Sequence, residues 1–270
     1  LGDIFPEAVS SMAANWSGVT LKHLLANASG APGDLNPSGI WTKLWDFNGL
    51  PVDGRKFLLN EVTTRPLRFT PGNGYEYSNA GFALAGHMLE TVAGKPWEVL
   101  MEERFFPAFG IESGGTGVPA TPRHLDHPVG HGGNSANPTI YDPGANADNP
   151  PAIGPAATVH MNIADMARYA QGHLRGAVGG LPSPLSPASW ETLHTRAYGN
   201  DYALGWGVYN APWAGGDFLQ HTGSNTQWFS AIWIVPELNW ACVVCINFGG
   251  TNAANKVNAV STWLFTNYGP

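Results

Sequence analysis

The spacing of apolar residues changes along the chain, from helical periodicity in the first two thirds to strand-like runs near the end. Apolar positions three and four residues apart predict helices over about 21–28, 78–93, 96–106 and 162–176, and Ser186 and Pro187 open a further short helix. Local signals place the ends of several of them. Gly94 and Gly176 close the second and fourth helices, Pro96 suits the first turn of the third, and Asn162 with Asp165 forms a capping pair that opens the fourth.

After residue 197 the apolar runs shorten and are separated by turn residues, which is typical of successive strands. These runs predict strands over 202–209, 218–221, 227–235 and 240–247. A closing helix carries one apolar stripe that would cover the resulting antiparallel sheet, formed by Val257, Val260, Leu264 and Tyr268. The prediction is an α+β fold, with a helix-rich subdomain over 1–197 and an antiparallel sheet subdomain with its C-terminal helix over 198–270.

Composition narrows the range of functions. The chain has 270 residues, enough for one large domain or two interleaved subdomains with a substantial core. Charged residues make up 12%, whereas there are 34 glycines and 22 prolines, a balance that favours an extracytoplasmic, periplasmic or secreted location. The net charge of −7 has no basic run, which argues against nucleic acid as a partner. No segment is long and apolar enough for a membrane helix. A loop rich in Gly, Pro, Asn and Asp over 114–155 is typical of the border of a binding site.

Metal, cofactor and redox chemistry receive little support. Cys242 and Cys245 lie three apart in an apolar run, so on a strand they point to opposite faces and are predicted to be two core thiols without a disulfide. His124, His127 and His131 resemble a zinc cluster, but they lie in a Pro- and Gly-rich loop with no predicted helix to align them. We therefore expect no metal and no cofactor.

The first candidate for catalysis is the triplet Tyr77-Ser78-Asn79, at the junction between a turn-rich approach and a predicted helix. A tyrosine can take or relay a proton when cationic neighbours favour its phenolate, and a helix N-terminus adds positive potential. Asn79 could offer its amide to an acyl carbonyl. The alternative is that Ser78 only caps the helix while Tyr77 packs.

The second candidate is the run His221-Thr222-Gly223 followed by Ser224, at the end of one predicted strand and before the next. An edge strand there could bind a substrate by backbone pairing, with Gly223 allowing close approach. The backbone N–H of Ser224 could serve as one donor of an oxyanion hole, and His221 could carry a proton near neutral pH. The alternative is a hairpin histidine that bonds only its neighbours.

These triplets, in this order, resemble the second and third catalytic elements of the serine beta-lactamase-like family, which includes class C beta-lactamases, penicillin-binding DD-carboxypeptidases, D-aminopeptidases and esterases. Further matching segments extend the resemblance over nearly the whole chain: 19–30, 69–79, 154–156 and 204–207. The resemblance implies a beta-lactamase/transpeptidase-like fold. It makes Tyr77 the proton shuttle, Asn79 a substrate-orienting donor, and His221 the occupant of a position where many lactamases have lysine. Ser224 would contribute its N–H, with Ser78, Thr222 and Gly223 contacting the substrate.

The family's first element, Ser-x-x-Lys, is absent from the 270 residues, since Val, Ile, Asp, Val and Ala stand three before the five lysines. The chain begins just after the place where the family keeps that element, so the expectation is that the N-terminal part of the fold is absent. Two functions stay open. One is a serine hydrolase that transfers an acyl group to water from an ester, a D-amino-acid amide or a peptide, with the acyl-enzyme forming on an upstream segment. The other is a non-catalytic descendant that binds such ligands. Association with the missing segment or with copies of itself is also expected.

Overall fold

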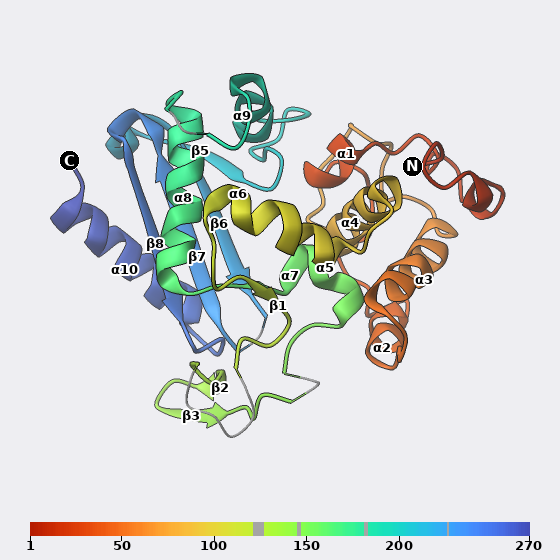
Figure 1. Cartoon of the computed structure of the whole chain (residues 1–270), viewed down its shortest axis with the longest axis horizontal. Helices are drawn as coiled ribbons and strands as arrows, with labels where there is room; N and C mark the ends of the chain where they lie inside the picture. The colour runs from red at the N-terminus through yellow and green to blue at the C-terminus, as the bar shows by residue number, and fades with distance from the viewer. Residues whose placement is uncertain (121–126, 145–146, 181–182, 226) are drawn as a thin grey trace. The chain divides into compact units, whose positions relative to one another are not determined.

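The computed structural model describes residues 1–120, 127–144, 147–180, 183–225 and 227–270, and the chain folds into two compact units (Figure 1). Unit 1 comprises Leu1–Glu103, Asn149–Thr158 and Arg196–Leu204, and unit 2 comprises Arg104–Asp148, Val159–Thr195 and Gly205–Pro270. The units are thus built from interleaved stretches. The boundary predicted at residue 197 differs from this division, because the contacts group helices before residue 197 with the sheet that follows it.

Unit 1 is helical. Its elements are η1 (Pro6–Ser11), α1 (Leu21–Leu25), α2 (Ile40–Trp45), α3 (Pro51–Thr63), α4 (Asn79–Ala93), α5 (Trp97–Leu100), η3 (Pro151–Ile153) and α7 (Gly154–Ala157). Their apolar faces share one hydrophobic core around α4. The fully buried residues of this core include Trp16, Leu24, Leu44, Leu58, Leu84 and Ile153. The predicted helix over 21–28 ends earlier, at Leu25, because Asn27 takes a left-handed conformation with φ 53°.

Local signals explain the bounds of α4, the helix that carries the first triplet. The Ser78 hydroxyl accepts a hydrogen bond from the backbone N–H of Gly81 and so caps the N-terminus. Gly94 ends the helix with a φ of 65°, a left-handed conformation that favours glycine. Gly86 allows α7 to pack closely, because a Cβ there would lie 2.2 Å from the ring of Pro155.

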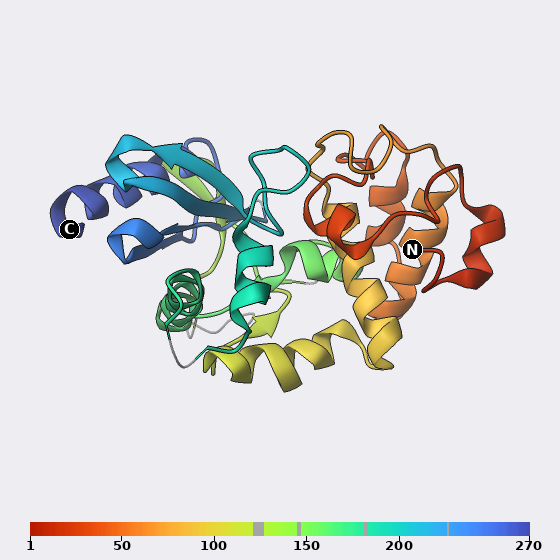
Figure 2. The same cartoon turned by 90° about the horizontal axis from the view of Figure 1, so that it is seen from above.

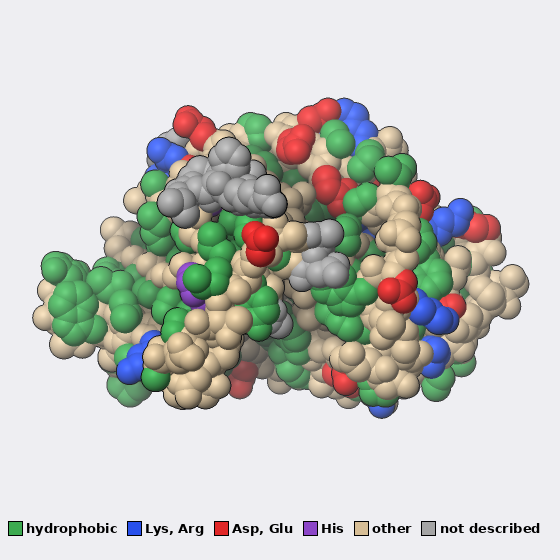
Figure 3. Space-filling view, turned by 90° about the horizontal axis from the view of Figure 1, so that it is seen from below, with side chains coloured by type: hydrophobic (Ala, Val, Ile, Leu, Met, Phe, Trp, Pro, Cys, Tyr) green, Lys and Arg blue, Asp and Glu red, His purple; other side chains and the backbone are tan. Residues whose placement is uncertain are grey.

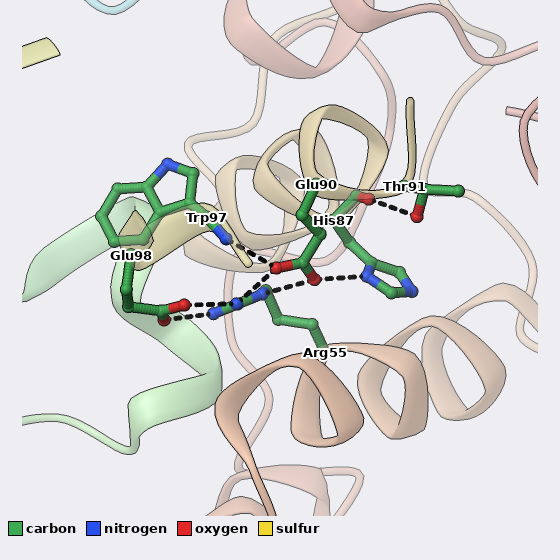
Figure 4. Close-up of polar contacts among 6 residues, drawn as sticks. All are labelled: Arg55, His87, Glu90, Thr91, Trp97 and Glu98. Atoms are coloured by element: carbon green, nitrogen blue, oxygen red, sulfur yellow. Dashed lines mark hydrogen bonds and ion pairs between the residues drawn. The ribbon is translucent and has the colours of Figure 1, made fainter. Parts of the chain in front are cut away.

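A buried ionic cluster joins three helices of unit 1 (Figure 4). The Arg55 guanidinium, from α3, makes paired hydrogen bonds of 2.6–2.9 Å to Glu90 of α4 and of 2.9 Å to Glu98 of α5. Glu90 also contacts Nδ1 of His87 at 2.7 Å and accepts from the N–H of Trp97 at 3.0 Å. The side chain of Arg55 is fully buried. Burial alone would raise the pKa of Glu90, but the bonds from His87 and Arg55 lower it to about 2.

Unit 2 contains a sheet and three longer helices. Its elements are α6 (Phe106–Phe109), β1 (Gly115–Thr116), β2 (His131–Asn134), β3 (Asn137–Ile140), β4 (Val159–His160), α8 (Ile163–Ala177), α9 (Pro187–His194), β5 (Gly207–Ala211), η4 (Pro212–Ala214), β6 (Gly216–Ser224), β7 (Phe229–Val235), η5 (Pro236–Leu238), β8 (Trp240–Ile246) and α10 (Ala253–Tyr268). The π-helical turn η2 (Met101–Phe105) links α5 to α6. The main sheet is antiparallel with the order β5-β6-β7-β8.

Helices α8 and α10 cover opposite faces of this sheet (Figures 1 and 2). Cys242 and Cys245 are three apart on β8 and therefore point to opposite faces. Cys245 contacts Met166 of α8, whereas Cys242 is hydrogen-bonded to Ser261 of α10. Both cysteines are free, as predicted, but neither is the core thiol expected from the sequence, because Cys242 is half-buried and Cys245 is exposed.

Three predicted features differ in the structure. The strand expected over 202–209 begins only at Gly207, because residues 202–204 belong to unit 1 and Gly205 has a φ of 91°. The loop over 114–155 contains a hairpin, β2–β3. On α10, Val257 is buried but Val260 and Tyr268 are exposed, because the small residues Ala253 and Ser261 complete the face toward the sheet. Of the described residues, none belongs to a helix long and apolar enough to cross a membrane.

Candidate active site

The first triplet stands at the N-terminus of α4 in unit 1, held by the backbone around it. The side-chain oxygen of Asn27 accepts from the N–H of Ser78 at 2.9 Å, and its backbone carbonyl accepts from the N–H of Glu76 at 2.9 Å. The Ser78 hydroxyl is buried and donates to the carbonyl of Pro32 at 2.7 Å while it caps the helix. These bonds fix the chain on both sides of Tyr77.

The two neighbouring side chains are more open. Tyr77 is 43% exposed, and Asn79, the first residue of α4, is half-buried. Burial of the rest of the ring raises the pKa of the Tyr77 phenol above its ordinary value. Tyr77 is therefore protonated at neutral pH in these 270 residues, and it can donate or relay a proton. Taking a proton would need an additional cation to lower its pKa.

The second triplet lies on β6 of unit 2, which continues through Ser224 and does not end near His221 as the sequence predicts. Strand β5 pairs with β6 only as far as Gly207 opposite Gln220. Strand β7 pairs with β6 to its end, where Phe229 is opposite Ser224. Within the described part of the chain, no strand therefore pairs with the β5 side of residues 221–224. Thr222, Gly223 and Ser224 are exposed there, as backbone pairing with a ligand requires.

His221 is half-buried on the face of the sheet that α8 covers. The register places it on the same face as Ile232 and Cys245, and its ring meets the Trp206 ring edge-on at 6.4 Å. Burial lowers the pKa of His221, although a hydrogen bond involving the backbone of Thr222 opposes this in part. The imidazole is consequently neutral near pH 7 and does not supply the permanent cation of a lysine. A Cβ at position 223 would lie 2.8 Å from the hydroxyl of Ser230, so glycine also serves the cross-strand pairing there.

The structure also shows which residues contact the two triplets; Asn27 and Trp206 lie in the matching segments 19–30 and 204–207, whereas Tyr202 does not. Asn27 anchors the first triplet, and Trp206 packs against the second. In unit 1, the buried Tyr202 ring lies 5.6 Å from the ring of Tyr75 and 6.5 Å from that of Tyr77. Neither Asn27 nor Tyr202 carries a local signal, because each acts on residues far away in the sequence.

The candidate metal cluster is only partly described. His124 lies outside the described residues, and Nδ1 of His131 is 3.0 Å from the backbone carbonyl of Asn247. Among the residues that the structure describes, no group of three or more His, Cys, Asp or Glu side chains is placed to hold a metal ion.

The fold and the two triplets define a class of protein: an α+β protein of the beta-lactamase/transpeptidase type. The sequence profile of the family described as Beta-lactamase matches residues 6–266, so the chain belongs to this family of serine hydrolases. The resemblance seen in the sequence is thereby confirmed. Expectations for single site residues stay predictions.

Relatives within the family differ in their named activities. The chain is 25% identical over 245 residues to unguisins hydrolase ungD' of Aspergillus campestris, covering 85% of this chain and 42% of that protein. It is 23% identical over 260 residues to penicillin-binding protein 4 of Amycolatopsis lactamdurans, covering 92% of this chain and 65% of that protein. A D-stereospecific amidohydrolase from Streptomyces sp. has a similar fold, with a TM-score of 0.72 at 18% identity, over 95% of this chain and 77% of that one. The chain thus spans less than two thirds of these curated relatives.

Proposed function

We propose that the chain carries the proton-transfer and substrate-binding elements of a serine hydrolase that moves an acyl group to water from an ester, a D-amino-acid amide or a peptide. The nucleophile would be a serine of a Ser-x-x-Lys element outside these 270 residues. The observation that carries the proposal is the exposed edge of β6 at residues 222–224, which lacks a pairing strand on its β5 side in the described part of the chain.

In this proposal each residue has a chemical task. The Tyr77 phenol relays the proton between the nucleophile and the leaving group, and Asn79 donates to the acyl carbonyl. The N–H of Ser224 stabilises the developing oxyanion, while Thr222 and Gly223 pair with the substrate backbone. His221 accepts or relays a proton as a neutral imidazole. Ser78, whose hydroxyl is buried and already bonded, contributes to binding by holding Tyr77 and Asn79 in place.

Acylation tests the proposal. The protein encoded by the longest reading frame that contains these residues should gain the mass of an acyl group when it is incubated with benzylpenicillin or p-nitrophenyl acetate. Tyr77→Phe should slow this acylation by roughly 100-fold or more, because a positioned acid–base group contributes about that factor. Tyr209→Phe changes an exposed tyrosine on β5 and should leave the rate unchanged. Intact-protein mass spectrometry against time measures both rates.

The alternative is a ligand-binding protein of the same fold without catalysis. The family's loop-to-helix and edge-strand elements could bind a D-amino-acid amide or peptide without an acyl-enzyme. A protein that gains no adduct from either reagent but still binds such a ligand in calorimetry would favour this alternative over the hydrolase.

Association is a separate expectation, and it arises from the surface of unit 2. Helix α10 exposes Val260, Trp263 and Tyr268, and hydrophobic side chains gather over this end of the chain at the left of Figure 3. In the described part of the chain β8 pairs only with β7, so its other edge is open. We expect the isolated chain to associate through these surfaces. Light scattering after size exclusion should show dimers or larger species, and Trp263→Lys should reduce them. A stable monomer with a sharp melting transition would contradict this expectation.

A further inference from the structure

We infer that Tyr202 is a positioning residue for Tyr77: its buried ring fixes the orientation of the Tyr77 side chain, and with it the direction in which the phenol moves a proton. The inference concerns unit 1 alone. It rests on the proposed function only for its effect on the rate.

The backbone bonds that hold the first triplet do not orient the Tyr77 ring. Asn27 accepts hydrogen bonds from the backbone N–H groups of Glu76 and Ser78, but the Tyr77 side chain itself is 43% exposed. A ring in that setting can turn about its side-chain torsions unless a neighbour limits it. Tyr202 is one such neighbour. The two ring planes cross at 84° with centroids 6.5 Å apart, an edge-to-face arrangement that aromatic pairs favour.

Tyr202 is itself buried and packed against other residues. It is 6% exposed, and its ring is tilted by 54° against that of Tyr75, which precedes the triplet. Its backbone carbonyl accepts from the N–H of Ala197 at 3.0 Å. Ala197 in turn packs with Ala26 and Ala28 in a small buried cluster. The backbone that carries the Tyr202 ring is therefore held by a hydrogen bond to a buried segment.

The segment that carries Tyr202 is tied to the same approach loop at other points. The amide of Asn200 donates to the carbonyl of Gly74 at 3.3 Å. The ring of Tyr198 lies 4.9 Å from that of His23 and also close to Gly72, where an added Cβ would lie 3.3 Å from it. Tyr198 thus anchors the segment, whereas Tyr202 contacts the ring of Tyr77. This difference makes Tyr198 a matched control.

The experiment measures the ionisation of Tyr77 directly. The chain, which has 8 tyrosines, is labelled with ¹³C at the ζ carbon of tyrosine, and Tyr77→Phe identifies the Tyr77 resonance. In Tyr202→Ala water reaches the phenol, so its pKa should fall back toward about 10, the ordinary value for tyrosine. Tyr202→Phe keeps the ring and should leave the titration of Tyr77 unchanged. If the alanine variant folds poorly, Tyr202→Leu replaces it, because leucine keeps an apolar side chain at this position. This variant should also lower the pKa of Tyr77.

Where the full-length protein forms an acyl adduct, Tyr202→Ala should slow acylation by about 10- to 100-fold, because a small misplacement of a reacting group costs up to about 100-fold. Tyr202→Phe should retain the rate to within about threefold. The inference is overturned if Tyr202→Ala leaves the Tyr77 titration unchanged, or if Tyr198→Ala shifts it equally. Because the titration needs no nucleophile, it still tests the inference when no adduct forms, and that second result bears on the proposed function alone.

Discussion

Replacing Arg55 with alanine is expected to lower the free energy of unfolding of unit 1 by about 3–5 kcal/mol, the usual cost of removing one partner from a buried ion pair. The guanidinium lies between two carboxylates and makes paired hydrogen bonds to both. Without it, Glu90 would remain in the core with its contacts to His87 and the N–H of Trp97 but without its arginine, and only 2% of its side chain is exposed. The penalty comes from this stranded carboxylate more than from the lost attraction.

Hydrogen exchange of the α3 and α4 amides measures the effect on unit 1, since exchange reports the stability of local regions. Urea unfolding gives an independent value. Arg55→Lys keeps the charge but cannot form two paired contacts, so it should lower the free energy of unfolding by less than the alanine substitution does, but still measurably. Combining Arg55→Met with Glu90→Gln removes the stranded charge and keeps an acceptor for the N–H of Trp97, so it should recover part of the loss.

The surface pair of Lys43 and Glu61 provides a comparison within the same unit. Its side chains are 54% and 29% exposed, so Lys43→Ala should cost less than about 1 kcal/mol. If Arg55→Ala cost no more than Lys43→Ala, the cluster would not stabilise the packing of α3, α4 and α5.

The same arginine shows why part of unit 1 could not be predicted from the sequence. Helix α3 turns Gly54, Arg55, Leu58, Leu59 and Val62 toward the core. A glycine and an arginine at buried positions interrupt the apolar periodicity that would reveal the helix. The burial of Arg55 depends on Glu90 and Glu98, which lie on other helices. The local sequence pattern around Arg55 therefore does not predict that it is buried.

Helices α4, α8 and α9 were predictable because their ends are set by neighbouring residues. Ser78, Asn162 and Ser186 each accept a backbone N–H three residues ahead, as N-capping residues do. The closing helix has no such restriction on its apolar face. Apolar side chains lie all round α10, and the choice of the Val257 face over the Val260 face follows from contacts with the sheet.

The candidate site was predictable to the same extent. Both triplets are contiguous in sequence, so Tyr77, Asn79, His221 and Ser224 could be selected from motifs. The protonation states of these groups could not be predicted from the sequence. The raised pKa of Tyr77 and the lowered pKa of His221 follow from burial, which only the fold creates, as it also creates the ring contacts of Tyr77 with Tyr202 and of His221 with Trp206.

Acidification from pH 6.5 to 4.5 is expected to lower the stability of unit 2 by an amount on the order of 3–5 kcal/mol, through the histidine pair formed by His173 of α8 and His194 of α9. Nδ1 of His173 lies 2.9 Å from Nε2 of His194. Uncharged rings surround His173, with centroids 4.5–5.9 Å away: Phe109, Tyr169, Trp190 and Trp206. Burial, and to a lesser extent His194, lowers the pKa of His173 to about 3, and burial lowers that of His194 to about 4.

The direction of the effect follows from proton binding. In the unfolded chain both histidines gain protons as the pH falls through about 6.5. In the folded chain they stay neutral until about pH 4 and 3. Between these limits the unfolded state binds more protons, so the free energy of unfolding decreases as the pH falls. Glu90 and Asp165 add to this loss mainly below about pH 4.5, because the unfolded chain binds protons at these carboxyls from their ordinary pKa values of 4.5 and 3.8 downward, whereas both pKa values are about 2 in the fold.

Urea unfolding at several pH values between 7 and 4.5, followed by hydrogen exchange of the α8 and α9 amides, measures this loss. The double variant His173→Gln, His194→Gln keeps side chains that can hydrogen-bond to each other but do not titrate. Its stability should therefore change much less over the same range, and His194→Gln alone should fall between the two. A wild-type stability that is constant from pH 7 to 4.5, or a double variant as pH-dependent as the wild type, would mean that the histidine pair does not control acid unfolding.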